Sequence, residues 1–305
     1  MNQRSLSRNA WIAFFVSPGL AIVAVFIILP LFMSLFNSLY YWQGMARLEF
    51  AGLQNFRRIF FQQPFSERFF NALGNNVKWF MTTMLVQNTL GLLFGYFLSR
   101  RIPGSRLFQR VFFVPVLFSI VAVGFLWRLY LTPGTGLVNQ FLLQVGLGSL
   151  ARPWLGEQAI ATYVIIAVNI WRWLGFPTLV FYAAINNVPQ DCLEAAYLDG
   201  ASETRVFFQV IVPLVIPAIM IITVLTMIGS LNVFEQVYTM TGLSGGPYYS
   251  TDTLGTLFYR TAFGGVDTGL PLIGVGSAIG VIIYLLTFAS SAVAILYFRG
   301  RETEL

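Results

Sequence analysis

The stretch VPQDCLEAAYLDGASETRVFFQVIVPLVIP, residues 188–217, predicts two short helices joined by a turn and followed by a long apolar helix. Pro189 suits the start of the first helix, because proline fits the first helical turn without losing a hydrogen bond. Gly200 supplies a tight bend, and Ser202 can cap the second helix. Pro213 then marks the entry into the apolar helix.

The composition around this stretch is that of a membrane protein. Hydrophobic residues make up 57% of the chain and charged residues 10%, against about 25% charged in soluble domains. The chain has no histidine, which argues against a zinc enzyme. Lys78 is the single lysine and follows Val77, so a phosphate-binding loop of the Walker type is excluded. Cys192 is the single cysteine, so no disulfide can form within the chain. The chain also lacks the basic run with interleaved aromatic residues that is typical of a nucleic-acid-binding surface.

Long apolar stretches predict an all-α membrane protein with about six transmembrane helices in one domain, residues 1–305. A helix needs about 20 apolar residues to cross the hydrocarbon core. The predicted spans are 11–39, 79–98, 111–131, 159–184, 213–236 and 270–298. The first is too long for a signal peptide and is interpreted as a retained anchor.

Charge asymmetry predicts that both termini lie in the cytoplasm. Cytoplasmic loops are enriched in arginine and lysine. The loop between the second and third spans carries Arg100, Arg101, Arg106 and Arg110 and no acid, and Arg299 and Arg301 follow the last span. The longer loop 40–78 is also basic and weakens the pattern. On the outer side, 137–145 is expected to form a surface helix and 238–269 an irregular docking or gating loop.

Residues 194–213 resemble the cytoplasmic coupling motif of permeases in binding-protein-dependent ATP-binding-cassette (ABC) importers. That motif is Glu-Ala-Ala, three residues, Gly, nine residues, then Ile, any residue, Leu-Pro. The chain has Val210 and Val212 at the Ile and Leu positions, which keeps their apolar character. The matching residues are Glu194, Ala195, Ala196, Gly200 and Pro213, and Asp199-Gly200-Ala201 is similar to the Asp-Gly-Ala of the sugar-permease branch.

The resemblance covers nearly the whole chain, in family order. AGLQNFRRIF at 51–60 and GLVNQFLLQVGL at 136–147 are similar to outer-loop phrases of the maltose-type and sugar-glycerol-phosphate-type permeases, although Ala51 stands where Val is usual. VYTMTGLSGGPYYSTDTLGTLFYRTAF at 237–263 is similar to a third phrase, with Ser244 as a departure.

This resemblance implies a type I ABC importer permease, a transport subunit and not an enzyme, in the cytoplasmic membrane of a prokaryote. Its expected partners are a second homologous permease, two ATPase subunits that hold ATP and Mg, an extracytoplasmic solute-binding protein and lipid. No cofactor or metal is expected in this chain. The residues expected to couple it to the ATPases are Glu194, Ala195, Ala196, Asp199, Gly200 and Pro213.

Three residues of the fourth span are candidates for the solute path. Asn169, Arg172 and Trp173 share one helix face by their spacing. A lone charge inside the membrane costs at least about 2.5 kcal/mol and faces protein or water. Hydrogen-bond donors beside an aromatic plate suit a sugar. A structural pair of Arg172 with Glu235, or with the partner permease, is an equally weighted alternative.

Further polar residues lie in the second and fifth spans. Asn232 and Glu235, after Gly229, are expected to line the path or its outer gate. Gln87 and Asn88 are also candidates for the path, but the interpretation favoured for membrane amides is a hydrogen bond between helices.

Other transport classes remain as alternatives. An ABC permease for a non-sugar solute is the runner-up. A secondary transporter would need an ion or proton site, and few membrane acids are present. A channel or membrane enzyme lacks a filter phrase or a nucleophile with its base. The sequence predicts a sugar, oligosaccharide, polyol or glycosylated polyol as the solute without selecting among them.

Overall fold

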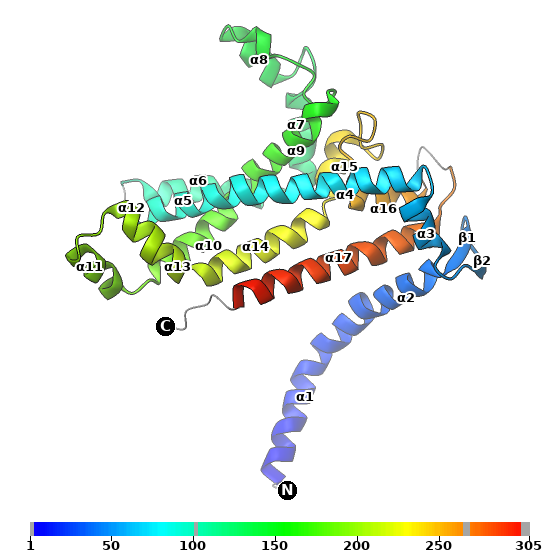
Figure 1. Cartoon of the computed structure of the whole chain (residues 1–305), viewed down its shortest axis with the longest axis horizontal. Helices are drawn as coiled ribbons and strands as arrows, with labels where there is room; N and C mark the ends of the chain where they lie inside the picture. Colours follow the sequence, from blue (N-terminus) through cyan, green and yellow to red (C-terminus); the bar gives the residue numbers. More distant parts are fainter. Residues whose placement is uncertain (1–2, 101–102, 265–268, 300–305) are drawn as a thin grey trace. The chain divides into compact units, whose positions relative to one another are not determined.

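The computed structural model describes residues 3–100, 103–264 and 269–299, which are mostly helical (Figure 1). Arg101 and Arg301, two of the arginines in the charge pattern, lie outside the described residues. The chain forms two compact units. The first comprises the described residues up to Ser66 together with Phe258–Ile282, and the second comprises Glu67–Leu257 and the described residues from Ile283.

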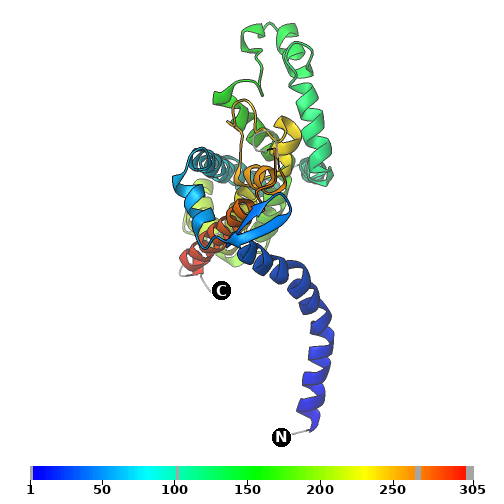
Figure 2. The ribbon, with the colours of Figure 1, turned by 90° about the vertical axis from the view of Figure 1, so that its right-hand side faces the viewer.

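The first unit contains one long apolar helix and a small hairpin (Figure 2). Pro30 lies just after a π-helical turn, where its missing N–H removes a regular helical hydrogen bond. The hairpin was not predicted from the sequence, and its turn uses Gly44 at φ +58°. The elements are α1 (Gln3–Val23), η1 (Ala24–Ile28), α2 (Leu29–Ser38), β1 (Tyr40–Gln43), β2 (Ala46–Phe50) and α3 (Gln54–Phe61).

The second unit begins within a continuous helical segment that runs from Phe65 to Ser99, and the first two residues of that segment belong to the first unit. It then contains several helices that are broken by short bends. The elements are α4 (Phe65–Thr82), η2 (Thr83–Asn88), α5 (Thr89–Ser99), α6 (Ser105–Leu117), α7 (Ile120–Tyr130), α8 (Leu137–Gln144), η3 (Gly148–Leu150), α9 (Gln158–Trp173), α10 (Gly175–Asn186), α11 (Gln190–Leu198), α12 (Glu203–Val206), η4 (Phe207–Ile211), α13 (Val212–Leu214), α14 (Ile216–Leu231) and α15 (Glu235–Thr241); α16 (Leu254–Phe263) and α17 (Ile273–Arg299) each have residues in both units.

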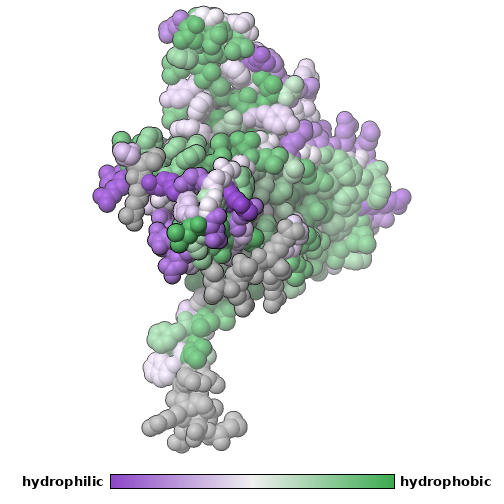
Figure 3. Space-filling model, turned by 60° about the vertical axis from the view of Figure 1, so that its left-hand side comes forward, coloured by the Kyte–Doolittle hydropathy of each residue, from purple (hydrophilic) through white to green (hydrophobic). Residues whose placement is uncertain are grey.

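Two described helices, Ala10–Ser38 and Ile273–Phe298, are long and apolar enough to cross a membrane, and three bent pairs would raise the number to five. The bends are 95° between α6 and α7, 46° between α9 and α10, and 69° at Val215 between Pro213 and Pro217. The stretch 79–98 lies within α4, η2 and α5 and is more polar, because it contains Gln87 and Asn88. Figure 3 shows hydrophobic residues over much of the visible surface, as expected of helices that face lipid.

Close packing of α5 against α10 organises the second unit. Gly91 and Gly95 are four residues apart and are both buried. A Cβ atom at Gly91 would lie 3.1 Å from Cβ of Pro177, and one at Gly95 would lie 2.9 Å from the backbone nitrogen of Tyr182. Small residues at this spacing let two membrane helices approach closely. The α5–α10 pair is therefore held by backbone contact.

Replacing Gly95 with leucine is expected to lower the melting temperature of the purified chain, because the side chain has no room against α10. Overpacking of this kind costs about 1–3 kcal/mol. Tryptophan fluorescence during heating measures the effect. Gly74→Leu is the matched control, since a Cβ atom there meets nothing within 4 Å. Equal melting of the two variants would contradict close packing at Gly95.

Candidate functional site

The predicted pair of short helices is present as α11 and α12, which we call the α11–α12 segment (190–206). Ser202 caps α12 as predicted, because its hydroxyl accepts a hydrogen bond from the Arg205 backbone N–H at 3.4 Å. Gly200 has φ +77°, a conformation that residues with a Cβ atom rarely adopt. A Cβ atom there would meet nothing within 4 Å, so the conformation and not crowding requires glycine.

The residues of the coupling motif differ in what they contact. Glu194 is exposed and accepts a hydrogen bond from the Gln190 amide at 3.2 Å, one turn earlier on α11. Ala195, Asp199 and Gly200 are exposed as well. Ala196 instead packs against a buried apolar cluster formed by Ile185, Val206, Ile211 and Val215. Pro213 is half-buried in α13, just before the bend. The side of the segment that carries Glu194 and Ala195 is thus exposed, and the side that carries Ala196 packs against the apolar cluster.

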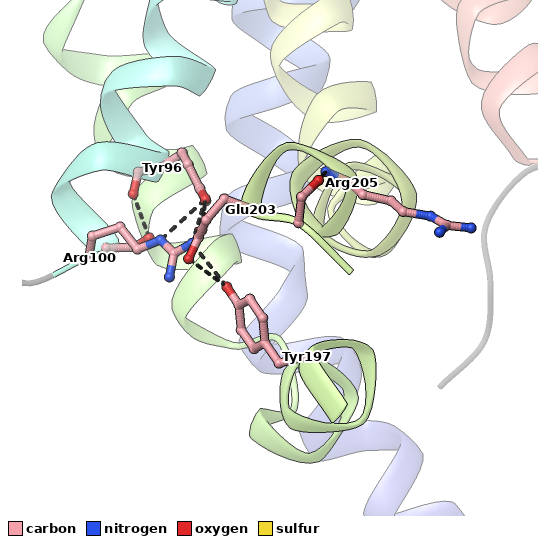
Figure 4. A network of polar contacts seen from close by, with 7 residues as sticks. Tyr96, Arg100, Tyr197, Glu203 and Arg205 are labelled. Carbon is pink, nitrogen blue, oxygen red and sulfur yellow. Dashed lines mark hydrogen bonds and ion pairs between the residues drawn. The ribbon is translucent and has the colours of Figure 1, made fainter. Parts of the chain in front are cut away.

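A polar network that the sequence analysis missed joins the α11–α12 segment to the end of α5 (Figure 4). Glu203 forms an ion pair with Arg100 and accepts hydrogen bonds from the hydroxyls of Tyr96 at 2.9 Å and Tyr197 at 3.2 Å. Arg100 also donates to both tyrosine hydroxyls, at 2.7 and 3.0 Å. From the sequence, Arg100 was interpreted only as a mark of membrane sidedness, because two of its three partners, Tyr197 and Glu203, lie about a hundred positions away.

A cavity of about 570 Å³ lies among η2, α9, α14 and α15 in the second unit. Six of the seven predicted path residues line it, namely Asn169, Arg172, Trp173, Asn232, Glu235 and Gln87. Trp79, Phe176 and Phe234 add aromatic surface. The cavity therefore combines amides, one cation and one carboxylate with apolar rings, as many small-molecule sites do.

Arg172 lies on the cavity wall beside Trp173. Its Nε donates to the Phe118 carbonyl oxygen at 3.3 Å, and its guanidinium carbon lies 5.4 Å from the centre of the Trp173 ring. Within the described part of the chain, Arg172 and Glu235 form no ion pair, although both line the cavity. The structure therefore does not show the alternative of a direct Arg172–Glu235 ion pair within this chain, and Arg172 bonds the Phe118 carbonyl oxygen instead.

Gln87 and Asn88 are neighbours with different surroundings. Asn88 donates to the Thr226 hydroxyl at 2.9 Å, which joins η2 to α14 as predicted for a membrane amide. Gln87 lines the cavity and is 2% exposed, and its Oε1 has no hydrogen-bond partner within the described part of the chain. Asn88 thus joins two helices, and Gln87 is the one of the two that lines the cavity.

Two further cavity residues, Thr83 and Gln236, were not singled out from the sequence. Thr83 Oγ1 and Gln236 Oε1 are buried and, like Gln87 Oε1, have no hydrogen-bond partner among the described residues. Most buried polar atoms in proteins are paired, so three unpaired ones around a single cavity require an explanation. Gln236 follows Glu235 directly, and Thr83 precedes Gln87 by four residues, a spacing that could have identified it. No group of three or more His, Cys, Asp or Glu side chains that could hold a metal occurs in the described residues.

Comparison with known proteins identifies the family. The family described as "Binding-protein-dependent transport system inner membrane component" matches residues 87–301. The chain is 32% identical to the probable ABC transporter permease protein YurN of Bacillus subtilis, over 95% of this chain and 96% of YurN. It is 32% identical to the lactose transport system permease protein LacF of Rhizobium radiobacter, over 86% of this chain and 85% of LacF.

A solved structure confirms the fold. The chain matches a chain of a bacterial alginate ABC transporter, crystallised with an alginate pentasaccharide-bound periplasmic protein, at a TM-score of 0.81 and 22% identity. The match covers 99% of both chains. The structural match thus confirms the predicted all-α permease fold, and the family match supports the membrane location. The chain belongs to the inner-membrane components of binding-protein-dependent transport systems and is an ABC importer permease, a transport subunit and not an enzyme.

Proposed function

We propose that this chain forms half of the membrane pathway of an ATP-driven importer for a sugar, oligosaccharide, polyol or glycosylated polyol. The observation that carries the proposal is the polar lining of the cavity, where the side-chain amides of Gln87, Asn169 and Asn232 lie beside aromatic rings. Amide groups both donate and accept hydrogen bonds. A solute with several hydroxyl groups, which also donate and accept, matches such a lining.

The rest of the cavity lining suits the same class of solute. Asn169 and Asn232 offer both donors and acceptors, and Arg172 offers donors only. Trp79 and Trp173 offer flat apolar surfaces for the C–H face of a pyranose ring. The lactose permease LacF and the alginate transporter, both similar to this chain, are named for carbohydrates.

The proposal includes the partners. A second, similar permease completes the pathway, two ATPase subunits hold ATP and Mg, and an extracytoplasmic solute-binding protein delivers the solute. The family description and the periplasmic protein in the alginate structure support such an assembly. The ATPases contact the exposed side of the α11–α12 segment, where Glu194 lies. Their closure on ATP moves the segment and switches the access of the cavity, as a rigid-body movement.

Both termini are proposed to lie in the cytoplasm. The ion pair of Arg100 with Glu203 supports this orientation, because it places the start of the arginine-rich loop on the same side as the α11–α12 segment. Two independent sequence signals, the arginine excess and the coupling motif, thus agree on which side is cytoplasmic.

The experiment is to reconstitute the intact complex in lipid nanodiscs, add its solute-binding protein, and measure ATP hydrolysis with a panel of solutes. We expect hydroxyl-rich solutes to stimulate hydrolysis, and amino acids, polyamines and inorganic phosphate to have no effect. Stimulation by one of the latter alone would overturn the sugar-type assignment. Uptake in vesicles that stops on ATP depletion but continues with an uncoupler excludes a secondary transporter.

Trp173→Ala is expected to lower the uptake of the stimulating solute about fivefold, because loss of an aromatic contact costs about 1 kcal/mol. The measurement is uptake of labelled solute into proteoliposomes. Trp171→Ala is the matched control. Trp171 lies two residues earlier on α9, packs against Trp127 with ring centres 5.5 Å apart, and does not line the cavity. Equal uptake by the two variants would show that Trp173 is only packing.

A further inference from the structure

We infer that Arg100 and Glu203, held by the hydroxyls of Tyr96 and Tyr197, form a clasp that carries movement of the α11–α12 segment to α5 and from there to the cavity. The inference rests on the proposed function, since it describes how ATPase closure reaches the solute. The clasp is the ion pair of Arg100 with Glu203 and the tyrosine hydrogen bonds around it.

The four side chains come from both sides of the joint. Tyr96 and Arg100 lie one turn apart at the end of α5, and Tyr197 and Glu203 lie on either side of the turn at Gly200. Both carboxylate oxygens of Glu203 are used: Oε2 accepts from Tyr96 and Oε1 from Tyr197. Glu203 therefore has a fixed position relative to α5 and to α11 at once. Figure 4 shows Arg205 directed away from this network, and its Nε donates to Gln209 at 2.8 Å instead.

Movement at Arg100 is transmitted along a single helical segment. η2 and α5 are continuous, so Gln87 on the cavity wall lies on the same segment as Arg100, thirteen residues away. At 1.5 Å per residue this is about 20 Å. Gly91 and Gly95 fasten the middle of the segment to α10 by close contact. A displacement of the α5 end is therefore passed along this segment to Gln87 and, through the close contact at Gly91 and Gly95, to α10.

The clasp matters for position more than for folding. An exposed ion pair contributes little to stability on its own, and here Arg100 and Glu203 are both solvent-accessible. The α11–α12 segment is also attached by the apolar cluster around Val206, and the Tyr96 ring lies 4.7 Å from the Phe207 ring. Breaking the clasp therefore leaves the segment folded and attached but loosens its link to α5. Because the segment is held both by the apolar cluster and by the clasp, charge variants of the clasp test the polar attachment alone.

The first test measures the link directly in the full-length chain. Cys192 is the single cysteine, lies on α11 and accepts a spin label without any added mutation. In nanodiscs, Arg100→Glu and Glu203→Arg are each expected to increase the mobility of the label, and the double variant is expected to restore it. Arg106→Glu, which removes an exposed arginine on α6, is the control. Unchanged mobility in both single variants would overturn the clasp.

The second test measures transmission in the assembled complex. The ratio of stimulated to basal ATP hydrolysis is expected to fall about tenfold in each single variant, within the range for residues in a coupling network. The double variant should regain most of it, and Arg106→Glu should match the wild type. If the label becomes more mobile in the single variants but the ratio of stimulated to basal ATP hydrolysis stays unchanged, the clasp does not transmit the movement. The mobility test needs no solute and therefore tests the clasp separately from the proposed function. A wild-type complex whose ATP hydrolysis no sugar stimulates would contradict the proposed function, and the label mobility would still show whether the clasp exists.

Discussion

Glu194→Lys is expected to abolish solute-stimulated ATP hydrolysis while the chain still folds and reaches the membrane. Glu194 is exposed on α11, and its hydrogen bond is to Gln190 on the same helix face. Loss of such a surface contact costs only tenths of a kcal/mol. A large effect on activity must then come from a partner, and a carboxylate in the coupling motif suits a basic group in an ATPase cleft.

The measurement is ATP hydrolysis by the reconstituted complex with and without loaded binding protein. Asp191→Lys is the control, because it makes the same charge change one turn earlier on α11 and outside the coupling motif. Glu194→Gln separates the loss of charge from its reversal and should retain partial stimulation. If Glu194→Lys responds to solute as the wild type does, the α11–α12 segment is not the contact with the ATPases.

The cavity shows what periodicity can predict. Asn169, Arg172 and Trp173 were grouped because residues three and four apart share a helix face, and all three line the cavity. Asn232 and Glu235 line it too, from the end of α14 and the start of α15. Intramembrane polar residues are costly unless they face protein or water, so their mere presence predicted a common interior. The all-α permease fold followed from the same reasoning about hydrophobic length, whereas the predicted number of about six spans stays a prediction, because the described residues contain two long apolar helices and three bent pairs.

The features that the sequence did not predict depend on contacts between distant residues or on local helix geometry. Gln87 and Asn88 both belong to η2, a π-helical turn, and only Gln87 faces the cavity. A regular helix pattern does not specify where such a turn occurs, although these turns are frequent at functional sites. The clasp joins Tyr96 to Glu203 across 107 positions. Nothing in the local pattern around Arg100 distinguishes a paired arginine from one that only marks the cytoplasmic side.

Asn76→Leu is expected to destabilise the chain strongly and to abolish uptake. Asn76 is fully buried on α4, and its side chain amide bonds both the end of α14 and the start of α16. Nδ2 donates to the Ser230 carbonyl oxygen at 2.6 Å, and Oδ1 accepts from the Leu254 backbone N–H at 2.9 Å. Leucine fills the space but leaves both backbone groups buried and unpaired, at about 1–3 kcal/mol each. Ser230 lines the cavity, so the loss reaches the solute path as well.

The melting temperature of the purified chain and the uptake by the complex measure these two effects. Asn71→Leu is the matched control on the same helix, because Asn71 donates to the Tyr249 carbonyl oxygen at 2.6 Å from an exposed position where water can replace it. Equal stability of Asn71→Leu and Asn76→Leu would mean that the end of α14 is held by its own packing, and that the buried amide of Asn76 does not fix the position of the cavity wall.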